Sequence, residues 1–259
     1  MAKRIVAIIQ ARMGSSRLPG KILLPIQGRP VIGHIHDRLN RVGSIDEVVI
    51  ATSNEIQDDQ VAHYCENENL SCFRGNEIDV LDRFYHAAIN FEAQIVIRVT
   101  GDCPLLDPLT INKLIDMYRL GNFDHCGVAA GAGVANDTSI QRYPDGLDAE
   151  IFGIEILREA WVNSTSKQHR EHVTPFIWQQ EERYSLGKLE CESGDFSAYR
   201  WTLDNAEDFQ LIKKIYDELY PRNPFFGMQD VLLLLKAHPE WSNENKHLIG
   251  SEGYEEFWN

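Results

Sequence analysis

Short apolar runs that alternate with longer amphipathic segments constrain the fold of this 259-residue chain more than any other feature of its sequence. Runs at 4–9, 47–52 and 95–100 are dominated by Ile and Val. Strands with such near-continuous apolar character are typical of parallel sheets that helices cover on both faces. We therefore predict an α/β fold of Rossmann-like type, with a predominantly parallel sheet between helices on both faces.

The remaining segments carry helical or strand periodicity of their own. In the first half we predict a strand at 71–74 and helices at 29–42, 58–67 and 79–91, the last capped by Asp79. In the second half we predict strands at 149–152 and 199–203 and helices at 154–164, 172–180, 206–219 and 228–237. We expect one domain over 1–240, with an elaboration at about 140–190, and a polar tail at 241–259.

The composition excludes several classes of protein. A net charge of −14 argues against non-specific binding of nucleic acid, because phosphate backbones select basic surfaces. The apolar stretch at 5–9 is too short for a signal peptide or a membrane span. No two of the five cysteines form a C-x-x-C pair, which argues against a structural zinc site and favours reduced thiols. We expect no nucleic-acid partner, no membrane partner and a cytoplasmic location.

The segment directly after the first strand combines three cations with two glycines. Ligands of parallel α/β sheets bind beyond the carboxyl ends of the strands, which is where this segment lies. Gly14 and Gly20 let a backbone approach phosphate oxygens, Arg12 and Arg17 can bind them with two N–H groups each, and Lys21 adds a compact charge. The spacing differs from that of a P-loop. A solvated basic loop is the alternative interpretation.

Two aspartates follow predicted strands far apart in the sequence. Asp102 comes after the strand at 95–100, and Asp204 comes after the one at 199–203. Carboxylate oxygens suit Mg²⁺, which typically takes one or two protein carboxylates and completes its shell with water and phosphate. The alternatives are local: Asp102 as a turn residue, and Asp204 as a helix cap with Glu207 three residues on.

Eight collinear motifs together resemble those of the nucleotide-sugar cytidylyltransferases, a family that includes the CMP-Kdo and CMP-acylneuraminate synthetases. The likeness is greatest to its spore-coat polysaccharide biosynthesis branch. The motifs are I-Q-A-R-M-G-S-S-R-L-P-G-K (9–21), V-V-I-A-T-S (48–53), F-R-G (73–75), D-V-L-D-R-F-Y (79–85), R-V-T-G-D-C-P-L-L-D (98–107), Y-P-D-G-L-D-A-E (143–150), R-E-H-V-T-P-F-I (170–177) and R-W-T-L-D-N-A-E-D-F (200–209).

The resemblance implies an enzyme that moves the cytidylyl group of CTP onto an acidic sugar and releases pyrophosphate, with Mg²⁺ as cofactor and Mn²⁺ as a possible substitute. The matching positions assign Arg12, Lys21, Asp102 and Asp204 to catalysis, the two aspartates as metal ligands. They assign the nucleotide to Ala11, Arg12, Gly14, Ser15, Arg17, Lys21, Ala51, Thr52 and Ser53, with Ala11 and 51–53 around the pyrimidine.

The acceptor is less defined, because the sugar-pocket segments of the Kdo and sialic acid enzymes do not align with 143–177. An anionic sugar, such as a nonulosonic or Kdo-type 2-ulosonic acid, would need cations for its carboxylate and carboxylates for its hydroxyls. The candidates are Arg142, Tyr143, Asp145, Lys167, Arg170 and His172. A sugar or polyol phosphate, a phosphonate, or an inactive nucleotide-binding protein are the alternatives.

We also expect a homodimer, chiefly from the resemblance. The region 143–185 adds Trp161, Phe176 and Trp178, aromatic residues of the kind enriched at interfaces.

Overall fold

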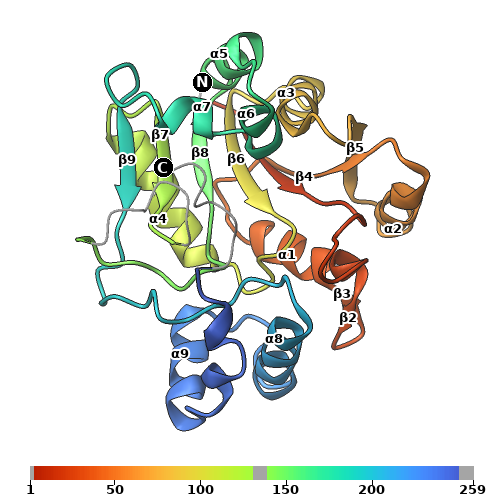
Figure 1. Ribbon diagram of the computed structural model, residues 1–259, viewed down its shortest axis with the longest axis vertical. Coiled ribbons are helices and arrows are strands. Elements are labelled where there is room, and N and C mark those ends of the chain that lie inside the picture. Colours follow the sequence, from red (N-terminus) through yellow and green to blue (C-terminus); the bar gives the residue numbers. More distant parts are fainter. Residues whose placement is uncertain (1–2, 131–138, 251–259) are drawn as a thin grey trace.

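A computed structural model describes residues 3–130 and 139–250 (Figure 1). Its centre is a seven-stranded sheet in the order β5-β4-β1-β6-β8-β7-β9. The strands are β1 (Ile5–Gln10), β4 (Glu47–Ser53), β5 (Ser71–Gly75), β6 (Ile95–Thr100), β7 (His125–Val128), β8 (Glu150–Gly153) and β9 (Leu186–Leu189). A separate ladder joins β2 (Pro25–Ile26) to β3 (Arg29–Pro30).

The helices are α1 (Val31–Leu39), α2 (Asp59–Asn67), α3 (Val80–Asn90), α4 (Pro108–Leu120), α5 (Ile154–Asn163), α6 (Lys167–His172), α7 (Pro175–Trp178), α8 (Ala206–Leu219) and α9 (Met228–Ala237). Short 3-10 turns lie at Lys21–Leu23, Ile56–Asp58, Trp241–Asn243 and Lys246–Leu248. Among the described helices, none is both long and apolar enough to cross a membrane.

The sheet is parallel apart from β8, which confirms the predicted fold. Strand β1 pairs in parallel with β4 and β6, and β8 runs against both β6 and β7. The register puts Gln10, at the end of β1, beside Ala51 of β4 and Thr100 of β6. The residues that follow these three strands therefore meet at one edge of the sheet. In Figure 1, α8 and α9 lie beyond that edge, below the end of β6.

Two apolar layers hold the sheet between helices, because alternate residues of a strand point to opposite faces. In β1, Ile5, Ala7 and Ile9 pack with α1 and α4, whereas Val6 and Ile8 pack with α3 and α5. The near-continuous apolar run of β1 thus serves both cores at once.

Two predicted elements are wrong. The helix predicted at 172–180 is wrong in form: α6 ends at His172, Val173 takes φ +73°, and Pro175 opens α7 at a position that suits proline. The strand predicted at 199–203 is also wrong. That segment makes a single bridge, between Arg200 and Asp145. Trp201 and Leu203 are buried by the packing of their side chains, without a strand that joins the sheet.

The remaining differences concern boundaries and missing elements. The helix predicted at 29–42 begins at Val31, after β3. Helix α4 and strands β7 and β9 were not predicted, although Asp107 caps α4 by accepting a hydrogen bond from Thr110 N.

The elaboration expected at about 140–190 is built onto the main sheet, since it supplies β8 and β9. The expected tail begins with ordered packing: the Asn245 side chain is buried and donates to Asp208 and to the carbonyl of Arg200. Residues 251–259 lie outside the described part. Phe176 and Trp178 are buried in the monomer, so their expected place in a dimer interface is wrong.

Gly146 closes a turn that only glycine fits. Its φ is +99°, and a Cβ atom there would lie 2.5 Å from both the Thr202 nitrogen and the Trp201 carbonyl carbon. The two segments 143–148 and 199–204 can therefore approach each other only because this residue lacks a side chain.

We expect Gly146→Ala to lower the free energy of unfolding by about 2 kcal/mol or more, since backbone strain and a backbone clash combine. Urea unfolding followed by circular dichroism measures this. Gly43→Ala is the control, because Gly43 has no positive φ and open space around it. It should stay within about 1 kcal/mol of the parent. Equal stabilities for the two variants would contradict the tight turn.

Candidate active site

A cavity of about 370 Å³ lies where the carboxyl ends of β1 and β6 meet the segments around 145–150 and 202–204. One wall carries the glycine-basic loop and both predicted metal aspartates: Arg12, Gly14, Ser15, Ser16, Arg17, Lys21, Asp102 and Asp204. A second group of lining residues comes from the end of β6, from β8 and the turn before it, and from the segments around α6 and α7: Arg98, Asp148, Glu150, Glu171, His172, Thr174 and Trp178. We call these the nucleotide wall and the far wall.

The glycine-basic loop is held from beneath by Asp58. This buried carboxylate accepts hydrogen bonds from Met13 N at 2.6 Å, from Ser53 N at 3.2 Å and from the Ser53 hydroxyl. The Met13 carbonyl in turn accepts from Ser15 N and Gly20 N. Among the hydrogen bonds of the described residues, none uses the N–H groups of Gly14, Ser16 or Arg17. These donors are available to an anion in the cavity.

Lys21 joins the two predicted metal aspartates. Its Nζ lies 3.1 Å from Asp102 Oδ2 and 2.7 Å from Asp204 Oδ1. Two residues 102 positions apart in the sequence therefore meet at one ammonium group. Burial lowers the pKa of Lys21, but the charges of the two carboxylates outweigh it and leave the pKa above its ordinary value. Lys21 is thus held as a fixed positive charge.

Asp102 is fixed by its neighbours at the end of β6. Thr100 Oγ1 donates to Asp102 Oδ1 at 2.5 Å, while Lys21 takes the other oxygen. Burial raises the pKa of Asp102, but the charge of Lys21 and these hydrogen bonds outweigh burial and hold the pKa below its ordinary value. Asp102 is therefore an ionised carboxylate that faces the cavity.

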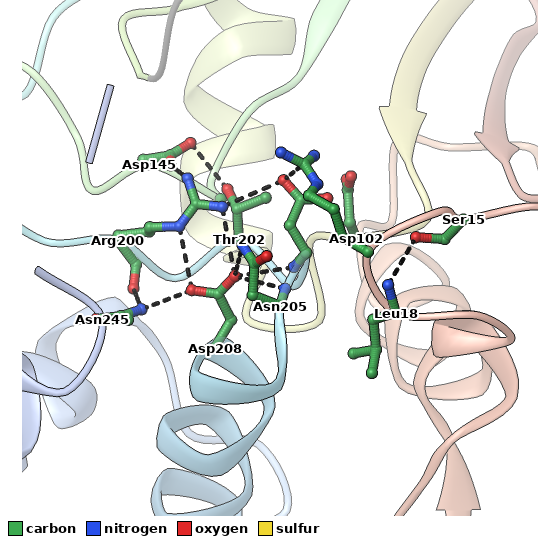
Figure 2. Close-up of polar contacts among 12 residues, drawn as sticks. Ser15, Leu18, Asp102, Asp145, Arg200, Thr202, Asn205, Asp208 and Asn245 are labelled. Atoms are coloured by element: carbon green, nitrogen blue, oxygen red, sulfur yellow. Dashed lines mark hydrogen bonds and ion pairs between the residues drawn. The ribbon is translucent and has the colours of Figure 1, made fainter. Parts of the chain in front are cut away.

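Asp204 is held by a buried arginine that sequence reasoning missed. Arg200 Nη2 lies 3.1 Å from Asp204 Oδ2, and the same guanidinium binds Asp145 and Asp208 at 3.1 Å each. Figure 2 shows Arg200 between Asp145 and Asp208, with Asn245 beside them. We call Arg200 and its three carboxylate partners, Asp145, Asp204 and Asp208, the Arg200 cluster. The sequence feature that could have indicated this cluster is the spacing of Asp204 and Asp208, which lie four and eight positions after Arg200.

The alternative interpretation of Asp204 as a helix cap is wrong. Asn205 occupies the N-cap position of α8, and the Asp208 carboxylate accepts from the backbone N–H groups of Asp204 and Asn205. The Asp204 carboxylate instead binds Lys21 and Arg200, and Arg17 Nη2 lies 3.0 Å from its Oδ2. Because other residues cap α8, the carboxylate of Asp204 is available to the cavity.

The far wall contains an ion pair between Arg98 and Glu150, two residues on adjacent antiparallel strands. Arg98 Nη1 lies 2.6 Å from Glu150 Oε2, Thr174 Oγ1 donates to the same oxygen, and His125 Nε2 lies 3.1 Å from Oε1. Burial raises the pKa of Glu150, but the charge of Arg98 and the contacts with His125 outweigh it and bring the pKa to about 2. Glu150 is therefore ionised at neutral pH.

The acceptor residues predicted from the sequence are scattered. His172 lines the cavity, and Asp145 lines it while bound to Arg200. Tyr143 is buried against Thr110. Arg142 and Lys167 are not among the lining residues.

Arg170 has a structural partner. Its guanidinium binds Asp79, the cap of α3, at 2.5 Å and donates to the Trp161 carbonyl at 2.6 Å. It too does not line the cavity. The sequence could not show this, because Asp79 lies 91 positions away.

The predicted pyrimidine residues lie beneath the glycine-basic loop. Ala11 N donates to the Ala51 carbonyl at 3.1 Å, which joins the ends of β1 and β4. Ala11, Ala51, Thr52 and Ser53 are all buried, and none is among the residues that line the cavity.

The donor set around Lys21 suits Mg²⁺ or Mn²⁺. Asp102 and Asp204 offer hard carboxylate oxygens, and each carboxylate has about four acceptor sites, more than Lys21, Arg17, Arg200 and Thr100 use. Within residues 3–130 and 139–250, no group of three or more His, Cys, Asp or Glu side chains is placed to hold an ion. Two protein carboxylates are what Mg²⁺ takes when substrate phosphates supply further ligands.

Comparison with known proteins agrees with this geometry. A family model of cytidylyltransferases matches residues 6–226. The spore coat polysaccharide biosynthesis protein SpsF of Bacillus subtilis is 32% identical over 248 residues, which cover 93% of this chain and 98% of that protein. A 3-deoxy-manno-octulosonate cytidylyltransferase of Trichlorobacter lovleyi is 37% identical over 119 residues, 46% of each chain.

Among solved structures, a cytidylyltransferase from Leptospira borgpetersenii serovar Hardjo-bovis superposes with a TM-score of 0.83 at 28% identity, and the match covers 93% of this chain and 97% of that one. With the family model and the SpsF match, this likeness extends over nearly the whole described chain. The chain therefore belongs to the cytidylyltransferases, a family of nucleotidyltransferases.

Proposed function

We propose that this enzyme transfers the cytidylyl group of CTP to a hydroxyl group of a sugar acid and releases pyrophosphate. The observation that carries the proposal is the position of Lys21. It ends the glycine-basic loop and at the same time binds the carboxylates of Asp102 and Asp204. One residue thus joins a phosphate-binding loop to a pair of metal-binding oxygens in a single cavity.

The nucleotide wall suits a triphosphate, which carries about four negative charges. Arg12 makes no ion pair with any described residue and lines the cavity, so its guanidinium can bind phosphate oxygens. Arg17 and Lys21 add two further cations, and the N–H groups of the loop add neutral donors. Phosphoryl-type transfer depends mainly on such positioning and charge stabilisation, and these groups would bind the pyrophosphate as it leaves.

In this proposal Asp102 and Asp204 would hold Mg²⁺, with Mn²⁺ as a substitute. The bound ion would offset phosphate charge beside the α-phosphorus. Thr100 orients the carboxylate of Asp102, and Arg200 orients that of Asp204.

We propose that cytosine is selected by the small residues Ala11 and 51–53 at the ends of β1 and β4. These residues are buried and do not line the cavity, so their assignment to cytosine rests on the resemblance of the motifs. The Asp58 carboxylate fixes the backbone of this region through Met13 and Ser53.

The charge of the far wall favours a carboxylate over a phosphate on the acceptor. Among the described residues of that wall, Arg98 supplies the one guanidinium, and the carboxylate of Glu150 already offsets its positive charge. Burial and the charge of Arg98 lower the pKa of His172, which favours its neutral form. Asp148 and Glu171 add negative charge. A phosphate dianion on the acceptor would be repelled there. A single carboxylate on the acceptor can instead share Arg98, and the acceptor's hydroxyls can then donate to the carboxylates of the far wall.

The Trichlorobacter lovleyi relative acts, by its name, on a sugar acid of this kind, 3-deoxy-manno-octulosonate. An inactive nucleotide-binding protein is the less favoured alternative, because such a protein has no need of the Lys21-linked carboxylate pair.

A cytoplasmic homodimer also remains our proposal. Ile89 and Val162 are largely exposed on the adjacent helices α3 and α5, next to the stacked rings of Tyr85 and Trp161, and such residues are typical of interfaces. A light-scattering mass near that of one 29.6 kDa chain would contradict it.

Pyrophosphate release tests the proposed reaction directly. We expect release from CTP with Mg²⁺ and a 2-ulosonic acid, in a panel that contains 3-deoxy-manno-octulosonate, N-acetylneuraminate and sugar phosphates. ATP and GTP should give little release, because the proposed site selects cytosine. Equal release from ATP and CTP would exclude the cytidylyl assignment, and turnover with sugar phosphates alone would exclude the sugar-acid acceptor.

Removing one cation of the nucleotide wall should slow turnover strongly. We expect Arg12→Ala and Lys21→Ala each to lower kcat/KM by at least ~10²-fold, since a lost preorganised charge partner commonly costs about 2.7–4 kcal/mol. Steady-state kinetics with CTP measures this. Lys236→Ala, on the exposed side of α9, is the control and should leave turnover unchanged. Near-parent kinetics in both loop variants would show that the loop does not bind the triphosphate.

A further inference from the structure

Asp148 is a cavity carboxylate to which the proposed function above gives no step in the reaction. It lies in the turn before β8 and lines the cavity together with Asp102 and Glu150. It is close enough to both of them for their negative charges to act on it. A carboxylate in a cavity that also holds Asp102 and Glu150 is unfavourable because like charges repel each other.

The backbone fixes Asp148 in place. Gly146, at φ +99°, donates its N–H to Asp148 Oδ2 at 2.8 Å. The same turn is tied to the Arg200 cluster, because Asp145 accepts from Arg200 and from Thr202 Oγ1. Asp148 is therefore positioned by the network that positions Asp204.

Asp148 differs from its neighbours in having no cation. Asp102 and Asp204 bind Lys21, Asp145 binds Arg200, and Glu150 binds Arg98. Among the described residues, none forms an ion pair with Asp148. Its hydrogen bonds come from backbone N–H groups, those of Gly146 and of Asp148 itself. Burial and the charges of Asp102 and Glu150 raise the pKa of Asp148 to about 6, despite the bond from Gly146.

A metal role does not explain this residue. Asp102 and Asp204 meet at Lys21, whereas Asp148 has no contact with Lys21 among the described interactions, and no three-carboxylate metal group is present in residues 3–130 and 139–250. A carboxylate that has no cation among the described residues, and that lines the same cavity as Asp102 and Asp204, can instead accept a hydrogen bond from a neutral donor. The acceptor's hydroxyl is the neutral donor that the reaction brings there.

We propose, on the basis of the cytidylyl transfer proposed above, that Asp148 is the catalytic residue that binds the attacking hydroxyl of the acceptor. The hydroxyl donates a hydrogen bond to the Asp148 carboxylate. As its oxygen forms a bond to the α-phosphorus of CTP, its proton passes to Asp148. The bond from the α-phosphorus to the oxygen that bridges to the β-phosphorus breaks, and that oxygen keeps the electron pair as pyrophosphate leaves.

Asp148→Asn tests this role, because it is nearly isosteric and can still accept the hydrogen bond from Gly146. Two quantities are measured: the Kd of Mg·CTP by calorimetry, and the single-turnover rate of pyrophosphate release with the sugar acid that supports turnover of the parent enzyme. We expect the Kd to stay within about threefold, while the rate falls ~10²-fold or more, as for loss of a general base. Asp116→Asn, an exposed carboxylate on α4, is the matched control and should behave as the parent.

The melting temperature separates a functional from a structural role. Because an ionised carboxylate without a cation is unfavourable, Asp148→Asn should melt at or above the parent temperature at pH 7.5. Asp148→Ala is the second variant and should show the same loss of rate.

Three outcomes would overturn the proposal: a parent-like rate in both variants, a Kd for Mg·CTP that rises in step with the loss of rate, or a large drop in melting temperature in both variants. Absence of release by the parent enzyme would instead overturn the proposed function itself.

Discussion

The bridge from Lys21 to Asp102 and Asp204 is the interaction on which the rest of the site depends. It joins the loop after β1, the end of β6 and the segment before α8 at a single ammonium group. Without that cation, two carboxylates would repel each other across the cavity. Because Arg200 binds Asp204 as well as Asp145 and Asp208, the geometry extends from the bridge to the turn that carries Asp148.

These ion pairs serve geometry more than stability. The Arg200 side chain is fully buried, and desolvation of buried charges offsets much of their mutual attraction. Removing one partner, by contrast, leaves an uncompensated charge that costs about 3–5 kcal/mol. The Arg200 cluster is therefore best understood as a means of holding Asp204 and the 145–148 turn in one arrangement. Asp148 forms no ion pair with any described residue, whereas Glu150 in the same wall is paired with Arg98, and this difference agrees with the proposed catalytic role of Asp148.

The sequence predicted the nucleotide wall well, because local features determine it. The apolar runs fix parallel strands, the carboxyl ends of parallel strands meet at one edge, and the glycine-basic loop and Asp102 follow two of those strands. Asp204 lines the same cavity, although the strand expected before it does not form. The sequence pattern could not show that Lys21 contacts both Asp102 and Asp204, because that contact depends on how distant segments pack.

The far wall was predicted poorly for the same reason. Arg170 carries the charge that an acceptor would need, but a cap residue 91 positions away binds it. Arg98 was passed over as a strand residue, although Arg98 and Thr100, two positions apart, place polar side chains on one face at the end of β6. Residue type and motif identify candidates. Only the packing of α3, α6 and β8 decides which of them reach the cavity.

A crystal structure with CTP and Mn²⁺, in which anomalous scattering locates the metal, tests the proposed metal site directly. We expect Mn²⁺ between Asp102 and Asp204, with carboxylate oxygens about 2.1 Å away or one water further out, and a triphosphate oxygen in its shell. In Asp204→Asn, the metal peak should be lost or strongly weakened. A metal bound away from both aspartates, or an unchanged peak in Asp204→Asn, would show that Asp102 and Asp204 do not form the metal site.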